Sequence, residues 1–218
     1  MFLLPFLLFY ELGSLRLQPS LDFEQADRVV AFQLLRVFFE LFGTTGRWMP
    51  ALAVVAILLG SQIASHHPWK VRPRSVLWLY AEAVAWAVPL LAVSRLFRLA
   101  GHQGPDANLW SDLVLCVGAG IYEELVFRLI LICLMVMIGA DLLRLSPGWT
   151  TLAAVLISAL AFAAHHHPPI GGEPFHSARF VFRLAAGLYL GTLFVYRGYG
   201  LAAGTHVAYN LAVAALAR

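Results

Sequence analysis

Long apolar stretches separated by short polar connections run through this chain. The pattern predicts membrane-spanning helices over residues 49–65, 76–97, 109–138, 149–165, 178–196 and 201–217. Residues 21–42 have helical spacing with a polar stripe that includes Arg36 and Glu40, which pair one turn apart, and we expect this segment to span as well. Residues 1–10 are apolar but too short to cross a hydrocarbon core of about 30 Å. The sequence therefore predicts an all-α transmembrane bundle of about six to eight membrane helices.

The longest apolar segment, residues 109–138, would measure about 45 Å as one helix, which is more than a membrane needs. Gly118 and Gly120 lie in its middle, so we expect the helix to break there. A loop is expected over residues 139–148. The most basic connection, residues 66–74, is placed in the cytoplasm by the positive-inside rule.

Composition supports a membrane protein and excludes several other classes. Hydrophobic residues make up 61% of the chain and charged residues only 12%, whereas an average soluble domain has roughly 25% charged residues. The net charge of +3 comes from scattered basic residues, so no nucleic-acid partner is expected. Cys116 and Cys133 lie inside apolar segments and form neither a disulfide framework nor a metal-type pair.

Three charged side chains, Glu123, Glu124 and Arg128, interrupt the longest apolar segment. Each costs roughly 2.5–3.5 kcal/mol near the centre of a membrane helix. Glu124 and Arg128 are four residues apart, so on a helix they meet, and a purely structural ion pair is the plain interpretation. Glu123 points about 100° away and has no local partner. A carboxylate at membrane depth without a local partner is a functional-site hypothesis by default.

Few other polar groups lie deep in the apolar segments. A run of three histidines at 165–167 ends one predicted span, and His206 shares a helix face with Asn210 in the last. Glutamate can act as a general base, neutral histidine can orient water or bind a metal, and histidine or asparagine can donate to an oxyanion. Together they suit the attack of water on a peptide carbonyl. For His206 and Asn210 alone, hydrogen bonding between helices is an equally open interpretation.

Structural interpretations are favoured for the polar groups nearer the helix ends. His165 and His167 are expected to face lipid headgroups, and His166 taken alone would be read in the same way. Glu82 is expected to reach the interface or to pair with an arginine. Arg179 and Arg183, one turn apart, are expected to anchor a helix end at the interface.

Taken in chain order, the polar positions resemble a family pattern. The motifs are Glu-Glu-x-x-x-Arg at 123–128, Phe-x-x-x-His at 162–166 and His-x-x-x-Asn at 206–210. They are similar to those of the CPBP family, the CaaX-protease and bacteriocin-processing intramembrane endopeptidases that are also called the Abi family. The resemblance covers roughly residues 110–215, and Phe162 selects the middle histidine of the run.

The resemblance implies a role for each matching residue. Glu123 would be the base that activates water, and His166 would help to hold that water. His206 and Asn210 would stabilise the oxyanion. Glu124 and Arg128 would hold the site together, with Glu124 assisting in the reaction.

Cofactor use stays open between none and zinc. A catalytic zinc site usually has three protein ligands and an open position, and Glu123, His166 and His206 would supply three. A metal-free, glutamate-dependent mechanism is consistent with the same residues. The flanking histidines of the run could take part in either case.

The sequence thus predicts an intramembrane endopeptidase that acts on a membrane-associated protein tail or precursor. By resemblance, the substrate is a prenylated CaaX tail, a bacteriocin or pheromone precursor, or a C-terminal sorting tail. Residues 1–108 would form accessory membrane helices and residues 109–218 the catalytic core, within one compact membrane domain. The expected partners are the substrate and the lipid bilayer. A short chain without a soluble domain is typical of a bacterial enzyme of the inner (plasma) membrane.

Two other functions stay open at this point. The chain could be a non-catalytic immunity or binding protein with the same fold. It could also be a proton-coupled transporter that uses Glu123 and His206 as a relay, although no internal repeat is visible to favour a transporter.

Overall fold

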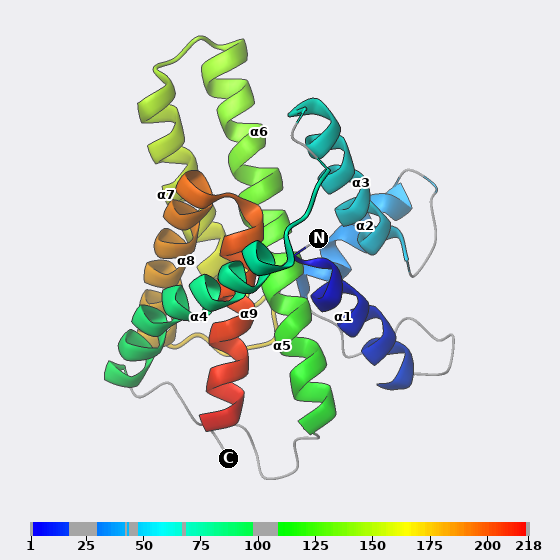
Figure 1. Ribbon diagram of the computed structural model, residues 1–218. Helices are drawn as coiled ribbons and strands as arrows, with labels where there is room; N and C mark the ends of the chain where they lie inside the picture. Colours follow the sequence, from blue (N-terminus) through cyan, green and yellow to red (C-terminus); the bar gives the residue numbers. More distant parts are fainter. Residues whose placement is uncertain are drawn as a thin grey trace.

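The computed structural model of the protein describes residues 2–17, 30–41, 43, 48–66, 69–97 and 109–216. All regular secondary structure within these ranges is helical (Figure 1). The first part contains α1 (Leu4–Leu17), α2 (Val30–Leu41), α3 (Met49–Ala64) and α4 (Pro73–Leu96). The second part contains α5 (Leu109–Glu124), the π-helix η2 (Leu125–Ile132), α6 (Cys133–Val136), the π-helix η3 (Met137–Leu142), α7 (Pro147–Ala164), α8 (Ser177–Arg197) and α9 (Tyr199–Leu216). The predicted all-α class is confirmed.

Four helical segments of the described chain are long and apolar enough to cross a membrane. They are Pro73–Leu96, Leu109–Leu142, Pro147–Ala164 and Ser177–Arg197, and α3 is a shorter apolar helix. All five overlap predicted spans. The other two expected spans do not meet these limits: α2 has only 12 residues, and α9 carries polar groups within its 18 residues. Residues 18–29, which include part of the span expected at 21–42, lie outside the described ranges.

The segment Leu109–Leu142 is one continuous helix of 34 residues, so the predicted break in it is wrong. Its two central glycines allow close packing instead. A Cβ atom at Gly118 would overlap the ring of Tyr10, and one at Gly120 would overlap Val207. The helix also extends through η3, which limits the connection before α7 to residues 143–146 rather than the predicted 139–148.

The backbone widens into η2 directly after the two glutamates that end α5. A π-helix is rare, and it occurs frequently where a helix contributes to a functional site. The sequence did not indicate this change in helix type. The π-helix η2 contains Arg128, which therefore lies in the widened turns of the same continuous helix as the glutamates.

Helices α5 and α9 pack against each other in the middle of the molecule (Figure 1). α1 packs against α5, α4 packs against α9, and α7 packs against both α8 and η2. The rings of Tyr10, Phe32 and Tyr122 meet where α1, α2 and α5 approach one another. The hydroxyl of Tyr122 donates to the buried carboxylate of Glu11 at 2.6 Å. The N-terminal helices therefore fix α5 at the residue that precedes Glu123.

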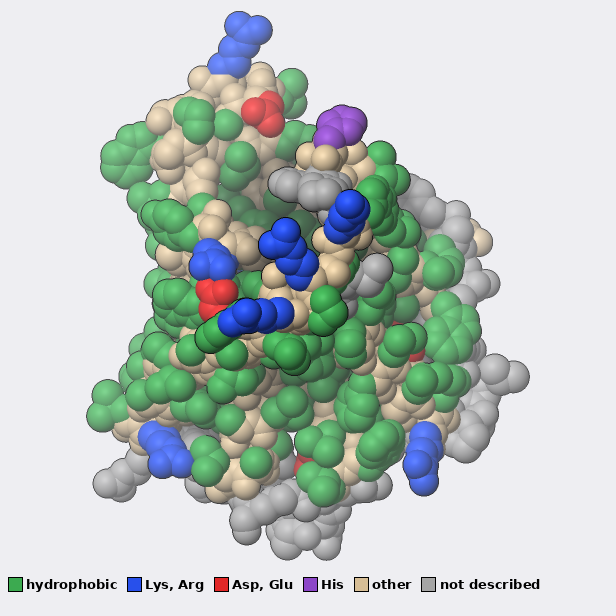
Figure 2. Space-filling model, in the orientation of Figure 1, with side chains coloured by type: hydrophobic (Ala, Val, Ile, Leu, Met, Phe, Trp, Pro, Cys, Tyr) green, Lys and Arg blue, Asp and Glu red, His purple; other side chains and the backbone are tan. Residues whose placement is uncertain are grey.

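Apolar side chains make up much of the face that Figure 2 presents, and Lys and Arg side chains interrupt them across its middle and near its edges. Two predicted surface pairings are confirmed. Arg36 and Glu40 form an ion pair at 3.2 Å, and Glu82 of α4 pairs with Arg197 of α8 at 2.8 Å. The sidedness expected from the basic loop at 66–74 stays a prediction, and residues 67 and 68 of that loop lie outside the described part of the chain.

Candidate active site

The two glutamates at the end of α5 and the arginine one turn later are all buried. Glu124 and Arg128 are 0% exposed and Glu123 is 6% exposed. Ionised side chains are costly in such surroundings, so nearby groups must compensate each charge. The partners of the two glutamates differ, and this difference defines the site.

Glu124 is held by two close partners. Its Oε2 atom lies 3.1 Å from Nε of Arg128, and its Oε1 atom accepts a hydrogen bond of 2.9 Å from Nδ1 of His206. The guanidinium of Arg128 lies over the ring of Phe162, 4.3 Å from its centroid, and Nη2 donates to the carbonyl of Gly187 at 3.4 Å. This ion pair thus links α5 and η2 to α7, α8 and α9.

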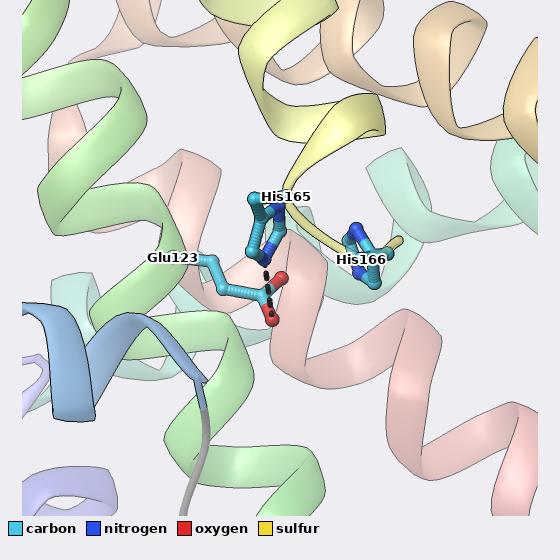
Figure 3. A group of neighbouring side chains, drawn as sticks. All are labelled: Glu123, His165 and His166. Atoms are coloured by element: carbon cyan, nitrogen blue, oxygen red, sulfur yellow. Dashed lines mark ion pairs between the residues drawn. The ribbon is translucent and has the colours of Figure 1, made fainter. Parts of the chain in front are cut away.

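Glu123 has neighbours at longer range. Its Oε1 atom lies 3.7 Å from Nε2 of His165, and its Oε2 atom lies 3.9 Å from Nε2 of His206. Both distances exceed a direct hydrogen bond. Figure 3 shows the carboxylate directed towards His165 and His166. Glu123 and these two histidines each offer one donor atom, and the three atoms lie within 4.8 Å of one another.

The hydrogen bonds of the three histidines determine which ring nitrogen faces the glutamate. Nδ1 of His165 and of His166 both lie against the carbonyl of Phe162, at 2.6 and 2.9 Å. Nδ1 of His206 lies against Glu124. Carbonyl and carboxylate oxygens only accept, so each Nδ1 carries the proton. In a neutral ring, Nε2 is then an acceptor or a metal ligand.

The histidine run is folded inward, beyond the end of α7. His165 is 2% and His167 is 6% exposed, so the expectation that they face lipid headgroups is wrong. The chain folds back over the run at Gly171, where a Cβ atom would overlap the backbone of His165 and His166. His165 also packs on the ring of Phe127, with centroids 4.6 Å apart. Helical spacing could not single out His165, because the run lies in a turn.

His166 remains neutral near physiological pH. Burial lowers the pKa of its imidazole to about 4, against the opposing effect of Glu123. The nearby charges of His165 and Arg183 lower this pKa further. The Nε2 atom of His166 is therefore an acceptor over the whole neutral range.

Arg179 and Arg183 of α8 both pair with Glu173, a residue that the sequence patterns did not single out. The prediction that these arginines anchor a helix end at the membrane interface stays a prediction, and the ion pairs with Glu173 are an additional role. Glu173 is also tied to the histidine run, since its N–H donates to the carbonyl of His166 at 3.2 Å and its carbonyl accepts from Nδ1 of His167 at 3.0 Å.

Asn210 lies one turn beyond His206 on α9, as predicted, but its side chain forms a hydrogen bond away from the two glutamates. Its Nδ2 atom donates to the carbonyl of Cys116 at 3.3 Å. Cys116 is seven residues, or about 10 Å, before Glu123 on α5. The structure thus brings five of the six predicted site residues into one network, namely Glu123, Glu124, Arg128, His166 and His206. The sixth, Asn210, forms its hydrogen bond about two turns away.

This arrangement can support two kinds of chemistry. A carboxylate without a close cationic partner can take a proton from water, and neighbouring imidazoles can orient that water. One carboxylate and two imidazoles are also ligands that zinc accepts in catalytic sites. The group that could hold a metal contains Glu123, His165 and His166, with His165 in place of the predicted His206.

One comparison with known proteins gives a match. Residues 105–212 match the family model described as Type II CAAX prenyl endopeptidase Rce1-like. The matched segment contains α5 and every residue of the network described above. No curated protein and no solved structure matches the chain.

Proposed function

The chain belongs, through residues 105–212, to the type II CAAX prenyl endopeptidase Rce1-like family of membrane proteases, and we propose that Glu123 is the base of its hydrolytic reaction. The proposed substrate is a membrane-associated protein whose C-terminal tail reaches the buried network. Residues 109–218 would form the catalytic core, and residues 1–108 would support it.

The observation that carries this proposal is the position of Glu123. Its carboxylate is buried, faces imidazole Nε2 atoms of His165 and His206 at 3.7 and 3.9 Å, and lacks a direct hydrogen bond from either. A water molecule needs two acceptors for its hydrogens. The carboxylate and a neutral imidazole Nε2 supply them, and the oxygen lone pair is then left for a substrate carbonyl.

The proposed reaction proceeds in two steps. Water gives one proton to Glu123 while its oxygen forms a bond to the carbonyl carbon of the scissile peptide. The C–N bond then breaks, and the proton on Glu123 passes to the leaving amine. The products are a new carboxyl group on the protein and a released C-terminal peptide with a free amine. Glu123 returns to its ionised form.

The tetrahedral intermediate carries an oxyanion that needs a donor. Nδ1 of His206 donates to Glu124, and this hydrogen bond fixes the orientation of the imidazole. Nε2 of His165 is then the imidazole nitrogen that accepts from the water, and Nε2 of His206, when it carries a proton, would donate to the oxyanion. Asn210 has a second amide N–H besides the one bonded to Cys116, and we propose this N–H as the additional donor that the family resemblance implies.

Zinc remains compatible with the same residues. Glu123, His165 and His166 would hold it, because their donor atoms converge and both Nδ1 atoms are engaged elsewhere. A bound zinc would polarise the substrate carbonyl and lower the pKa of bound water.

Cleavage assays with the purified protein test this proposal. The substrates would be three fluorogenic tail peptides: a farnesylated CaaX peptide, a bacteriocin-precursor peptide and a C-terminal sorting peptide. We expect the wild-type protein to cleave the CaaX peptide, and Glu123→Gln and His166→Ala to lower kcat by at least about 100-fold.

A chelator separates the two mechanisms. Activity that survives a chelator supports glutamate-dependent hydrolysis, and activity that is lost and then restored by zinc supports a metalloenzyme. Equal cleavage by the wild-type and Glu123→Gln proteins would contradict the proposed role of Glu123. A lack of cleavage of all three peptides would favour the immunity-protein or transporter alternative.

A further inference from the structure

Arg183 has a buried guanidinium nitrogen that the structure leaves without a hydrogen-bond acceptor. Its Nη2 atom binds the carboxylate of Glu173, whereas its Nη1 atom is buried and has no partner among the described residues. A buried N–H group without an acceptor is costly, so this nitrogen calls for an acceptor from water or from a ligand. The rest of the side chain keeps 20% of its surface exposed.

Packing places Arg183 at the same end of the helix pair as the histidines. Gly187, one turn after Arg183 on α8, packs against Ala159 of α7 and accepts a hydrogen bond from Arg128. Arg183 lies on that same face of α8, about 6 Å further along the axis. The connection between α7 and α8 makes the two helices antiparallel. The direction from Gly187 to Arg183 along α8 therefore leads towards the C-terminal end of α7, and His166 lies just beyond that end.

Hydrogen bonds of the connection confirm this placement. Glu173 pairs with Arg183 through its carboxylate and with the carbonyl of His166 through its backbone N–H at 3.2 Å. The charge of Arg183 also contributes to the lowered pKa of His166. The guanidinium and the histidine therefore belong to one assembly, built on the residues between α7 and α8.

The charges around Glu173 do not balance. One carboxylate is shared by two guanidiniums, those of Arg179 and Arg183. One positive charge remains, and Arg179 is the more exposed of the two, with 44% of its side chain accessible. The partly buried Arg183 is thus the arginine suited to bind an anion, and Glu173 holds its guanidinium in a fixed orientation.

We propose that Arg183 binds the free α-carboxylate at the C-terminus of the substrate tail. This rests on the proposed function, because an endopeptidase that cuts near the end of a tail meets that carboxylate whenever it binds substrate. Guanidinium nitrogens match a carboxylate in geometry and charge. The enzyme would then measure the position of its cut from the end of the chain and would act poorly on internal sequences.

Two peptides that differ only at their ends test this inference. Both are farnesylated fluorogenic CaaX peptides of one sequence, one with a C-terminal carboxylate and the other with a carboxamide. We expect the wild-type protein to prefer the carboxylate form by about tenfold or more in kcat/KM, mainly through KM, as for a charged hydrogen bond. In Arg183→Gln this ratio should fall to about one.

Two further variants distinguish recognition from a loss of structure. Arg183→Lys keeps the charge and should retain part of the preference. Arg179→Gln removes the excess charge but leaves the guanidinium that contacts the substrate, so it should lower the preference less than Arg183→Gln does. A preference that persists in Arg183→Gln, or that is missing in the wild-type protein, would overturn the inference while leaving the proposed hydrolysis intact.

Peptide binding decides the question if no cleavage occurs. Should the wild-type protein cleave neither peptide, the proposed function fails, and fluorescence anisotropy with the same two peptides still tests Arg183. A tenfold tighter binding of the carboxylate form that disappears in Arg183→Gln supports the inference. Equal binding of the two forms overturns it.

Discussion

Two adjacent carboxylates in the middle of this protein have opposite surroundings. Glu124 is fully buried and has Arg128 at 3.1 Å and His206 at 2.9 Å. Glu123 is the next residue along the same helix, and its nearest imidazole nitrogens lie at 3.7 and 3.9 Å. Both oxygens of Glu124 thus have a close partner, whereas the groups around Glu123 lie beyond hydrogen-bond distance.

This difference separates a structural role from a reactive one. A carboxylate that is already paired on both oxygens gains nothing by taking a proton from water. A carboxylate whose neighbours are beyond hydrogen-bond distance can still accept a hydrogen bond from water at both oxygens. His206 contacts both glutamates, through Nδ1 on one side and Nε2 on the other, so it transmits the fixed position of Glu124 to the reactive side.

The largest effect is expected from Glu123→Gln. The amide has the same shape and cannot accept the proton, so kcat should fall by about 10²–10⁴-fold. No ion pair closer than 3.7 Å is lost, so the midpoint of thermal unfolding in detergent should stay within about 2 °C of the wild type. Peptide cleavage and thermal unfolding measured on the same preparations check both expectations. A large fall in the unfolding midpoint would contradict the contrast between the two glutamates.

Arg128→Met should have its main effect on stability. The change leaves Glu124 charged, buried and without its guanidinium, which costs about 3–5 kcal/mol. For a chain of this length the unfolding midpoint should fall by on the order of 10 °C. The double variant with Glu124→Gln removes both charges and should recover part of that loss. A double variant no more stable than Arg128→Met would show that the ion pair is not the cause.

The spacing of residues in the sequence was enough to identify the ion pair of Glu124 and Arg128 in this network. Glu124 and Arg128 stand four residues apart on one helix, and the rule for such pairs gives their contact without a structure. The same rule gave the pair of Arg36 and Glu40. The apolar stretches likewise gave the helices, because hydrophobic length determines membrane-spanning segments directly.

The spacing of residues along the sequence could not predict contacts between segments that are far apart in the chain. His165 follows the last residue of α7, where side-chain directions no longer obey the helical period, and it is buried with its Nε2 atom 3.7 Å from Glu123. Glu11 bonds to Tyr122 across 111 positions of sequence. Gly118 favours a helix break by sequence, whereas in the structure it allows the close approach of Tyr10. Each of these depends on a neighbouring helix that local sequence does not specify.

A smaller effect on the free energy of unfolding is expected from a change of pH, because His166 beside Glu123 becomes protonated at low pH. Its pKa of about 4 in the folded protein lies below the 6.5 of an unfolded histidine, so between these values the unfolded chain binds more protons. The stability contributed by neutral His166 is therefore complete above pH 6.5 and is lost as the pH falls towards 4. At pH 5 the loss should be on the order of 1–2 kcal/mol.

His166→Asn provides the control for this pH dependence, because asparagine does not titrate. Carboxylates that titrate in the same range contribute equally to both proteins, so the difference between their unfolding midpoints isolates His166. Between pH 7 and pH 5 the midpoint of the wild-type protein should fall further than that of the variant. Parallel curves would contradict a neutral, buried His166.

The smallest effect is expected at the exposed ion pair of Glu82 and Arg197. Its nitrogen and oxygen are 2.8 Å apart, closer than Glu124 and Arg128, but 47% of the arginine side chain is exposed. Screening and side-chain entropy reduce such pairs to about 0–1 kcal/mol. Arg197→Gln should therefore shift the unfolding midpoint by no more than about 4 °C, and 1 M salt should shift the wild-type midpoint little. A loss as large as that of Arg128→Met would mean that distance, and not burial, sets the strength of the ion pairs in this protein.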